Sequence, residues 1–264
     1  MDARLEALAS ALAAAWRDGT TIPLPPSGQG VASRAEAYQV QDRMAALIGK
    51  PVAGWKVGAT VRAVQVFEGH DGPLPGRVFA DRLFSASGDA PVEVPAAAMH
   101  GMKAECELAF RVTADFPAGK PVDPAALRAA AVFHPAVEIA ATRYAPGTGN
   151  RASTTFDGIA DNGTGGAAVI GPAVTDWGRI PFETLEIDAH LDGSPSIQAY
   201  GGAYRRDPFV ILGETIADLH GRGIDVAAGC VFLTGSSTLP TPVRRGQTLV
   251  VRMGNFAPFS LKLV

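Results

Sequence analysis

The sequence predicts a β-rich α+β fold that follows a small helical N-terminal subdomain. Two segments before residue 50 space their apolar residues as helices do, whereas the rest of the chain breaks into short β-like runs. Glycine and proline contribute 30 and 20 of the 264 residues, an excess typical of many turns between short strands. We therefore expect a helical subdomain at residues 1–50 and a β-rich domain at residues 51–264.

The overall composition excludes several classes of protein. Hydrophobic residues make up 47% and charged residues 19% of the chain, a balance that disordered proteins do not have. The net charge of −3 offers no basic footprint for nucleic acid, and no apolar run approaches the roughly 20 residues of a membrane helix. Two cysteines cannot form a disulfide framework, and the N-terminus lacks the pattern of a secretory signal. We expect a cytoplasmic protein without nucleic-acid or membrane partners.

The first helix is expected at residues 2–17. Leu5, Leu8, Leu12 and Trp16 recur there near the 3.6-residue period of an amphipathic helix. A proline-rich connector follows, because proline cannot continue a helix.

A second helix is expected between Ser33 and Gly49. Ser33 followed by Glu36 has the spacing of a capping box, and glycine is the residue that most often ends a helix. Two further helices are expected at Asp123-Pro124 and Asp207-Pro208, because each pair places an N-cap acid before a proline at the first helical position.

Short apolar runs bounded by glycine and proline predict the strands. The expected strands lie at residues 52–59, 103–112, 131–141, 167–174, 184–193, 230–235, 248–253 and 259–264. Residues 61–90, with Phe67, His70, Leu74, Phe79 and Phe84, are interpreted either as a lid or pocket wall or as ordinary packing.

Three glutamates are the most informative candidate site residues. Glu105 and Glu107 alternate along one strand, so their side chains project from the same face, opposite the apolar Cys106. Glu138 is an isolated carboxylate in another apolar strand, where a charge is costly without a partner. Oxygen ligands of this kind suit Mg²⁺ or Mn²⁺. The alternative for Glu105 and Glu107 is a solvated strand face with Lys103 as an ion-pair partner.

Two further segments have both a functional and a structural interpretation. Lys56 lies between Trp55 and Val57, where its ammonium can hold a carboxylate or carry a proton, or can simply reach the surface. Residues 234–238, Thr-Gly-Ser-Ser-Thr, follow a strand and can form an anion nest or an ordinary turn.

Other chemistries have little support in the sequence. The five histidines lack zinc-ligand spacing, and no phosphate-binding loop is present. Ser236 is not in a G-x-S-x-G context, so a hydrolase triad is not expected. Cys106 lacks an activating base and is expected to be inert.

Several motifs occur in a familiar order along the chain. They are Gly54-Trp55-Lys56-Val57-Gly58, Glu105-x-Glu107, Glu138-Ile139, Ile159-Ala160-Asp161-Asn162, Ala228-Gly229 and Thr234-Gly235-Ser236. In this order and spacing the chain resembles the 2-keto-4-pentenoate hydratase / 4-oxalocrotonate decarboxylase branch of the fumarylacetoacetate hydrolase superfamily, from about residue 5 to the C-terminus. The resemblance implies a rolled mixed sheet with helices outside it, and a homo-oligomer.

The resemblance also implies a site. Mg²⁺ or Mn²⁺ is expected at the residues matching Glu105, Glu107 and Glu138, where a 2-oxo acid chelates the metal. Lys56 matches the active-site lysine of the family. Thr234, Gly235 and Ser236 match the loop that receives the substrate carboxylate.

The expected activity is that of a metal-dependent lyase in aromatic catabolism, a hydratase acting on a small 2-hydroxy-dienoic acid through a metal-stabilised enolate. One departure bears on this expectation. Family hydratases typically carry an acid in a Pro-Asp-Phe-Gly stretch, and this chain has Leu74 there, which we assign to the substrate pocket. Leu74 cannot transfer a proton, and decarboxylases of the family tend to be apolar at that place. A 2-oxo acid decarboxylase, a C–C bond hydrolase and a non-catalytic metal-binding protein therefore stay open as alternatives.

Overall fold

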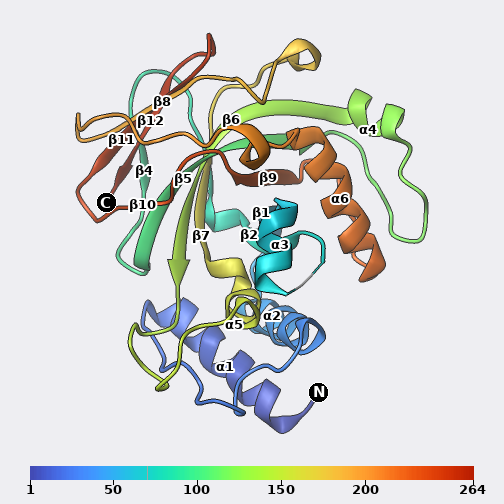
Figure 1. Cartoon of the computed structure of the whole chain (residues 1–264), viewed down its shortest axis with the longest axis vertical. Coiled ribbons are helices and arrows are strands. Elements are labelled where there is room, and N and C mark those ends of the chain that lie inside the picture. The colour runs from blue at the N-terminus through green and yellow to red at the C-terminus, as the bar shows by residue number, and fades with distance from the viewer. Residues whose placement is uncertain (70) are drawn as a thin grey trace.

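Two β-sheets, a pair of N-terminal helices and four further α-helices make up the part of the chain described by this computed structural model, residues 1–69 and 71–264 (Figure 1). His70 lies outside the described residues. The larger sheet has the strand order β2-β1-β9-β5-β6-β7-β3, with β10 paired to β5, and the smaller sheet has the order β4-β12-β11-β8. The strands are β1 (Val52–Gly58), β2 (Leu74–Phe79), β3 (Leu83–Ser85), β4 (Val92–Val94), β5 (His100–Val112), β6 (Ala131–Thr142), β7 (Gly165–Ile170), β8 (Ile187–Leu191), β9 (Val231–Ser236), β10 (Thr241–Pro242), β11 (Thr248–Met253) and β12 (Phe259–Leu263).

Six α-helices and four short 3₁₀ turns are assigned within the described part of the chain. The helices are α1 (Ala3–Asp18), α2 (Arg34–Ile48), α3 (Arg62–Glu68), α4 (Pro124–Ala130), α5 (Thr155–Ala160) and α6 (Pro208–Gly221). The 3₁₀ turns are η1 (Ala80–Arg82), η2 (Asn162–Thr164), η3 (Trp177–Arg179) and η4 (Gly202–Tyr204). Among these helices none combines the length and the apolar character that a membrane span needs.

The helix boundaries agree with the capping residues of the sequence. The Ser33 hydroxyl accepts a hydrogen bond from the amide of Glu36, and Gly49 ends α2 in the left-handed conformation at φ 68°. Asp123 and Asp207 cap α4 and α6 through their carboxylates. The predicted helices at these positions are confirmed, whereas α3 and α5 were not expected.

The mixed character of the sheet is confirmed as well. β5 pairs antiparallel with both β6 and β9, while β9 runs parallel to β1. β9 follows α6 late in the sequence and lies between β1 and β5, so the sheet is not built in chain order. In Figure 1 the long strands β5 and β6 curve across the middle of the molecule, and α4 and α6 lie beside one end of the sheet.

The two faces of the larger sheet differ in what they carry. On β5 the side chains of Ala104, Cys106, Leu108 and Phe110 enter the main hydrophobic core, which they share with the smaller sheet and α6. The opposite face carries small residues, among them Ala109 and the neighbouring alanines of β6 and β7. The candidate site lies on this second face.

A second hydrophobic core fills the space between the N-terminal helices and the sheet. Leu5, Leu12 and Met44 of α1 and α2 share it with Leu74 and Phe79 of β2. The rings of Trp16 and Phe79 meet edge to face, with their centroids 5.1 Å apart. The N-terminal helices therefore pack against β2 and stabilise its position.

The interpretation of residues 61–90 divides by residue. Phe79 is buried in the second core, and Phe84 packs against the main core, so both are packing residues. Phe67 on α3 is 91% exposed. His70 lies outside the described residues.

Candidate metal centre

The strand register brings the three predicted glutamates together. Glu105 on β5 lies directly opposite Glu138 on β6, and Glu107 projects from the same face two residues further along β5. One carboxylate oxygen from each of the three lies within 4.8 Å of the others. Glu107 and Glu138 are buried, while Glu105 is partly exposed, so the cluster opens toward solvent on the side of Glu105.

The cluster carries more negative charge than its surroundings balance. Burial, followed by the charges of Glu138 and Glu105, raises the pKa of Glu107 well above its ordinary value. Burial also raises the pKa of Glu138, to about 7, although Lys56 opposes this. With all three carboxylates ionised and Lys56 as the one ammonium, the cluster would carry an excess of two negative charges, and the raised pKa values reflect how costly that is without a further cation.

Lys56 supplies the one positive charge seen among these groups. Its Nζ lies 3.1 Å from Glu138 Oε1 and donates a 2.8 Å hydrogen bond to the carbonyl oxygen of Gly163. Burial lowers the pKa of Lys56, but the three glutamates outweigh it, so that the pKa is raised overall. The side chain therefore stays an ammonium in this arrangement.

The donor set fits a hard divalent cation. Glu138 Oε1 is buried, and its neighbour is the Lys56 ammonium at 3.1 Å. Three converging carboxylates are the ligand type that Mg²⁺ or Mn²⁺ prefers. Glu105, Glu107 and Glu138 could thus hold such an ion with positions left for a small ligand on the exposed side.

The position of Lys56 depends on close backbone packing beneath it. A Cβ at Gly76 would lie 2.4 Å from the carbonyl oxygen of Asn162, so only glycine admits this approach of η2 to β2. The Asn162 side chain exchanges two 2.8 Å hydrogen bonds with the backbone of Arg77. These contacts hold η2 against β2 and so place the Gly163 carbonyl oxygen beside Lys56.

A buried ion pair fixes the other side of the same turn. Asp161 accepts hydrogen bonds from the Nε and backbone amide of Arg143 and from the Thr142 hydroxyl. Arg143 also donates a 2.7 Å hydrogen bond to the carbonyl oxygen of Gly165. The sequence singles out Asp161 only within the motif Ile159-Ala160-Asp161-Asn162, and nothing in it pairs the residue with Arg143. The pair joins the end of β6 to the start of β7.

The loop at residues 234–236 touches the glutamates through its backbone. The amide of Gly235 donates a 2.7 Å hydrogen bond to Glu107 Oε2. The Thr234 hydroxyl donates to the carbonyl oxygen of Leu108, and the Ser236 hydroxyl donates to that of Thr238. All three groups thus have partners inside the protein, and the clearest role visible here is to orient Glu107.

Leu74 shares a strand face with Lys56. The register pairs Lys56 with Gly76 and Gly58 with Leu74, so both side chains project from one face of the β1–β2 pair. Leu74 is 8% exposed and packs with the second core. The strand face that carries Lys56 therefore has an apolar residue, and no acid, at position 74.

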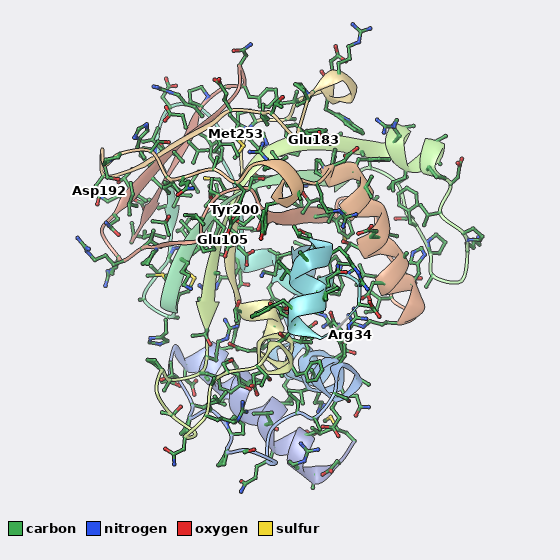
Figure 2. All side chains as sticks on the ribbon, viewed as in Figure 1. Arg34, Glu105, Glu183, Asp192, Tyr200 and Met253 are labelled. Atoms are coloured by element: carbon green, nitrogen blue, oxygen red, sulfur yellow. The ribbon has the colours of Figure 1, made fainter. Side chains whose placement is uncertain are left out.

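Tyr200 is a residue that the sequence analysis missed. Figure 2 shows it close to Glu105 near the centre of the molecule, on the segment that precedes α6. Partial burial is the larger cause that raises the pKa of the Tyr200 phenol, and the negative charge of Glu105 raises it further. Its segment has no helical or strand periodicity, so no pattern in the sequence could have placed it here.

Comparisons with known proteins agree with this geometry. No protein-family model matches the chain. The chain is 32% identical over 245 residues to 2-keto-4-pentenoate hydratase 1 of Dechloromonas aromatica (strain RCB), a match that covers 91% of this chain and 90% of that protein. It is 28% identical over 207 residues to 2-keto-4-pentenoate hydratase of Paraburkholderia xenovorans (strain LB400), covering 76% of this chain and 73% of the other.

A solved structure matches the fold over nearly its whole length. 4-Oxalocrotonate decarboxylase from Pseudomonas putida G7, complexed with magnesium and adipate, superposes with a TM-score of 0.83 at 22% identity, covering 98% of this chain and 97% of that one. A rolled mixed sheet with helices outside it is thereby confirmed. The chain belongs to the 2-keto-4-pentenoate hydratase family, and it shares its fold with 4-oxalocrotonate decarboxylase.

Proposed function

We propose that this chain is a divalent-metal-dependent lyase that hydrates a small 2-hydroxy-dienoic acid; its relatives are named 2-keto-4-pentenoate hydratase. The observation that carries the proposal is the convergence of Glu105, Glu107 and Glu138 within 4.8 Å, beside the buried ammonium of Lys56. Membership of a family with hydratase relatives at 32% identity supports the substrate class, which is a small 2-oxo acid or its enol.

Each residue has a role that follows from its position. Glu105, Glu107 and Glu138 hold Mg²⁺ or Mn²⁺, and the cation supplies Lewis-acid polarisation of the substrate's 2-keto oxygen. The Gly235 amide fixes the orientation of Glu107 through its 2.7 Å hydrogen bond. Lys56 lies beside Glu138, where its ammonium can orient the substrate carboxylate or deliver a proton to the substrate carbon chain. The hydrogen bonds of the Thr234 and Ser236 hydroxyls maintain the conformation of the loop that would receive this carboxylate.

Decarboxylation of a 2-oxo acid is the second candidate. Leu74 presents an apolar side chain on the face that carries Lys56, and a leucine cannot activate water. Loss of CO₂ needs no activated water, so this observation favours decarboxylation over hydration. Both reactions pass through the same stabilised enolate of the substrate. A C–C bond hydrolase would also need a water-activating group.

One experiment separates these activities. The purified protein, treated with EDTA and then given Mg²⁺ or Mn²⁺, is incubated with 2-hydroxypenta-2,4-dienoate and with 2-oxohex-3-enedioate. Metal-dependent loss of the dienoate absorbance supports hydration, and metal-dependent CO₂ release from the diacid supports decarboxylation. Turnover that persists in EDTA overturns the metal-dependent mechanism. Metal binding without turnover of either compound leaves a non-catalytic metal-binding protein.

We also propose that the enzyme is a homo-oligomer of the cytoplasm. An apolar groove of about 540 Å³ between α4 and α6, lined by Leu127, Phe209 and Val210, supports a contact between copies. Cys106 and Cys230 are free thiols, which suits a reducing compartment. Sedimentation velocity of the purified protein tests the oligomer, and fractionation of the producing cells tests the compartment.

The helical N-terminal segment, residues 1–50, is proposed to act as a subdomain that supports β2. It packs α1 against α2 and shares its core with Leu74 and Phe79. Limited proteolysis tests the boundary, since cleavage between residues 49 and 51 without further fragmentation is expected for a separable unit.

A further inference from the structure

Beside the glutamate cluster, a segment that leads to α6 pairs with the chain after β9 through an isolated β-bridge. Ala199 pairs antiparallel with Thr238, the amide of Tyr200 donates a 2.9 Å hydrogen bond to the carbonyl oxygen of Ser237, and the amide of Leu239 donates to that of Gln198. The segment containing Ser237 is in turn bonded to β5, because its amide donates a 2.8 Å hydrogen bond to the carbonyl oxygen of Cys106. One segment of backbone, at Ser237, thus separates Tyr200 from Cys106, the residue between Glu105 and Glu107.

The alternation of side chains along this segment determines which way Tyr200 points. Ala199 packs against the main core, on the face where Cys106 lies. The next side chain of an extended segment points to the opposite face. Tyr200 therefore projects toward the face that carries Glu105 and Glu107, in agreement with the view in Figure 2.

The Tyr200 ring and the backbone of its segment each have a partner. The ring stacks on the ring of Tyr204, with centroids 5.7 Å apart and an interplanar angle of 24°. The buried guanidinium of Arg205 donates hydrogen bonds to the carbonyl oxygens of Tyr200, Phe182 and Leu185, and so ties the segment to the core. Tyr200 and Glu105 are both partly exposed and lie close together in Figure 2, so the ring offers a flat, accessible surface beside the cluster.

We propose that Tyr200, backed by Tyr204, is a specificity-determining residue whose ring stacks on the substrate's carbon chain beyond the α-keto acid, and that it selects planar, conjugated tails. The proposal rests on the proposed function, because it takes the α-keto acid to be held at the glutamates. A flat conjugated chain gains from face-on contact with an aromatic ring, whereas a saturated chain, free to bend, matches the ring less well.

A cation on the same face could instead recognise the distal part of the substrate through its charge. Lys103 projects from β5 two residues before Glu105 and is exposed. It could attract a distal carboxylate, but it adds nothing to the binding of an uncharged tail. The variant Lys103→Met is therefore the matched control for a contribution that depends on the ring alone.

The test measures competitive binding of three probes to the metal-loaded protein: oxalate, 2-oxopentanoate with its saturated tail, and 2-oxo-4-phenylbut-3-enoate with its planar tail. We expect the planar acid to bind the wild type more tightly than the saturated acid, and Tyr200→Ala to weaken it by roughly three- to tenfold. Tyr200→Phe keeps the ring and should keep the preference, Tyr204→Ala should reduce it in part, and Lys103→Met should leave it unchanged.

Oxalate separates failure of this proposal from failure of the proposed function. It has no tail, so its metal-dependent affinity should be the same in the wild type and in Tyr200→Ala. If oxalate does not bind the wild type in a metal-dependent way, the proposed function is wrong. If oxalate binds normally while Tyr200→Ala keeps the wild-type preference for the planar acid, the role of Tyr200 is refuted. Loss of the preference in Lys103→Met but not in Tyr200→Ala refutes it equally.

Discussion

The ammonium of Lys56 lies 3.1 Å from Glu138 Oε1, and both side chains are buried on one face of a curved mixed sheet. The same ammonium is bonded to the carbonyl oxygen of Gly163, on a turn that packs closely against β2. Lys56 is therefore held by a charge on one side and by backbone on the other. This gives it a fixed position beside the place where the three glutamates meet.

Replacing Lys56 tests its part in catalysis. We expect Lys56→Met to lower kcat by about 10²- to 10⁴-fold, the range for loss of a proton-transferring group. Affinity for Mn²⁺ should not fall, because the variant removes a positive charge from the acidic cluster. Steady-state kinetics and a metal titration measure the two effects. Lys50→Met, which removes an exposed lysine paired with Asp81, is the control. An unchanged kcat in Lys56→Met would show that the residue is structural.

Replacing Glu107 tests the metal site. Glu107→Gln keeps an oxygen to accept the Gly235 hydrogen bond but removes one of three mutually repelling charges. Without metal we expect a higher unfolding temperature than that of the wild type, and with Mg²⁺ a much smaller rise. Thermal unfolding with and without Mg²⁺ measures both. Glu93→Gln, on the exposed face of β4, should keep the full metal-induced rise. Equal rises in Glu107→Gln and the wild type would contradict the assignment.

The buried pair of Arg143 and Asp161 should dominate local stability. Asp161→Asn leaves a buried guanidinium without its counter-charge, and we expect a loss of about 3–5 kcal/mol in the free energy of unfolding. Urea unfolding followed by circular dichroism measures it. The exposed Asp188 pairs with His190, and Asp188→Asn should cost less than about 0.5 kcal/mol. Similar losses for the two variants would show that burial of the Arg143 pair adds nothing.

Asp157 makes a pH-dependent contribution to stability. Burial raises the pKa of Asp157, but hydrogen bonds from Arg151 and Thr154 outweigh it and lower the pKa below its ordinary 3.8. A group whose pKa is depressed by folding stabilises the protein above its unfolded pKa and loses that contribution as the pH falls through its folded pKa.

We therefore expect Asp157→Asn to be less stable than the wild type by about 1 kcal/mol, the size of a lost helix cap, at pH 7 and at pH 5. The difference should shrink only below about pH 4. Urea unfolding at several pH values from 7 to 3 measures it. A difference that disappears already between pH 7 and 5 would contradict this origin.

The local features of the fold could be predicted because they depend on neighbouring residues. Ser33 and Gly49 bound a helix through hydrogen bonds and backbone conformation within a few residues. The common face of Glu105 and Glu107 follows from strand alternation alone. The short helices α3 and α5 were not predicted, because segments of seven and six residues are too short to show a helical period in the sequence.

The rest depends on pairing between distant segments. The register that sets Glu105 opposite Glu138, and the ion pair of Arg143 with Asp161, are properties of the folded sheet. The residue types already grouped the three glutamates as candidate metal ligands, and the family resemblance implied the same set. Neither the sequence pattern nor the family resemblance indicated Tyr200, because its position depends on the isolated bridge between Ala199 and Thr238.

The central position of β9 has a consequence for how the molecule forms. β1 and β5 are synthesised early, but β9, which pairs with both of them, is synthesised only after α6. Until Ser236 has emerged, the nascent chain exposes two open strand edges, and Glu107 lacks the hydrogen bond from the Gly235 amide. Contacts so remote in sequence predict slow folding and a dependence on chaperones during synthesis.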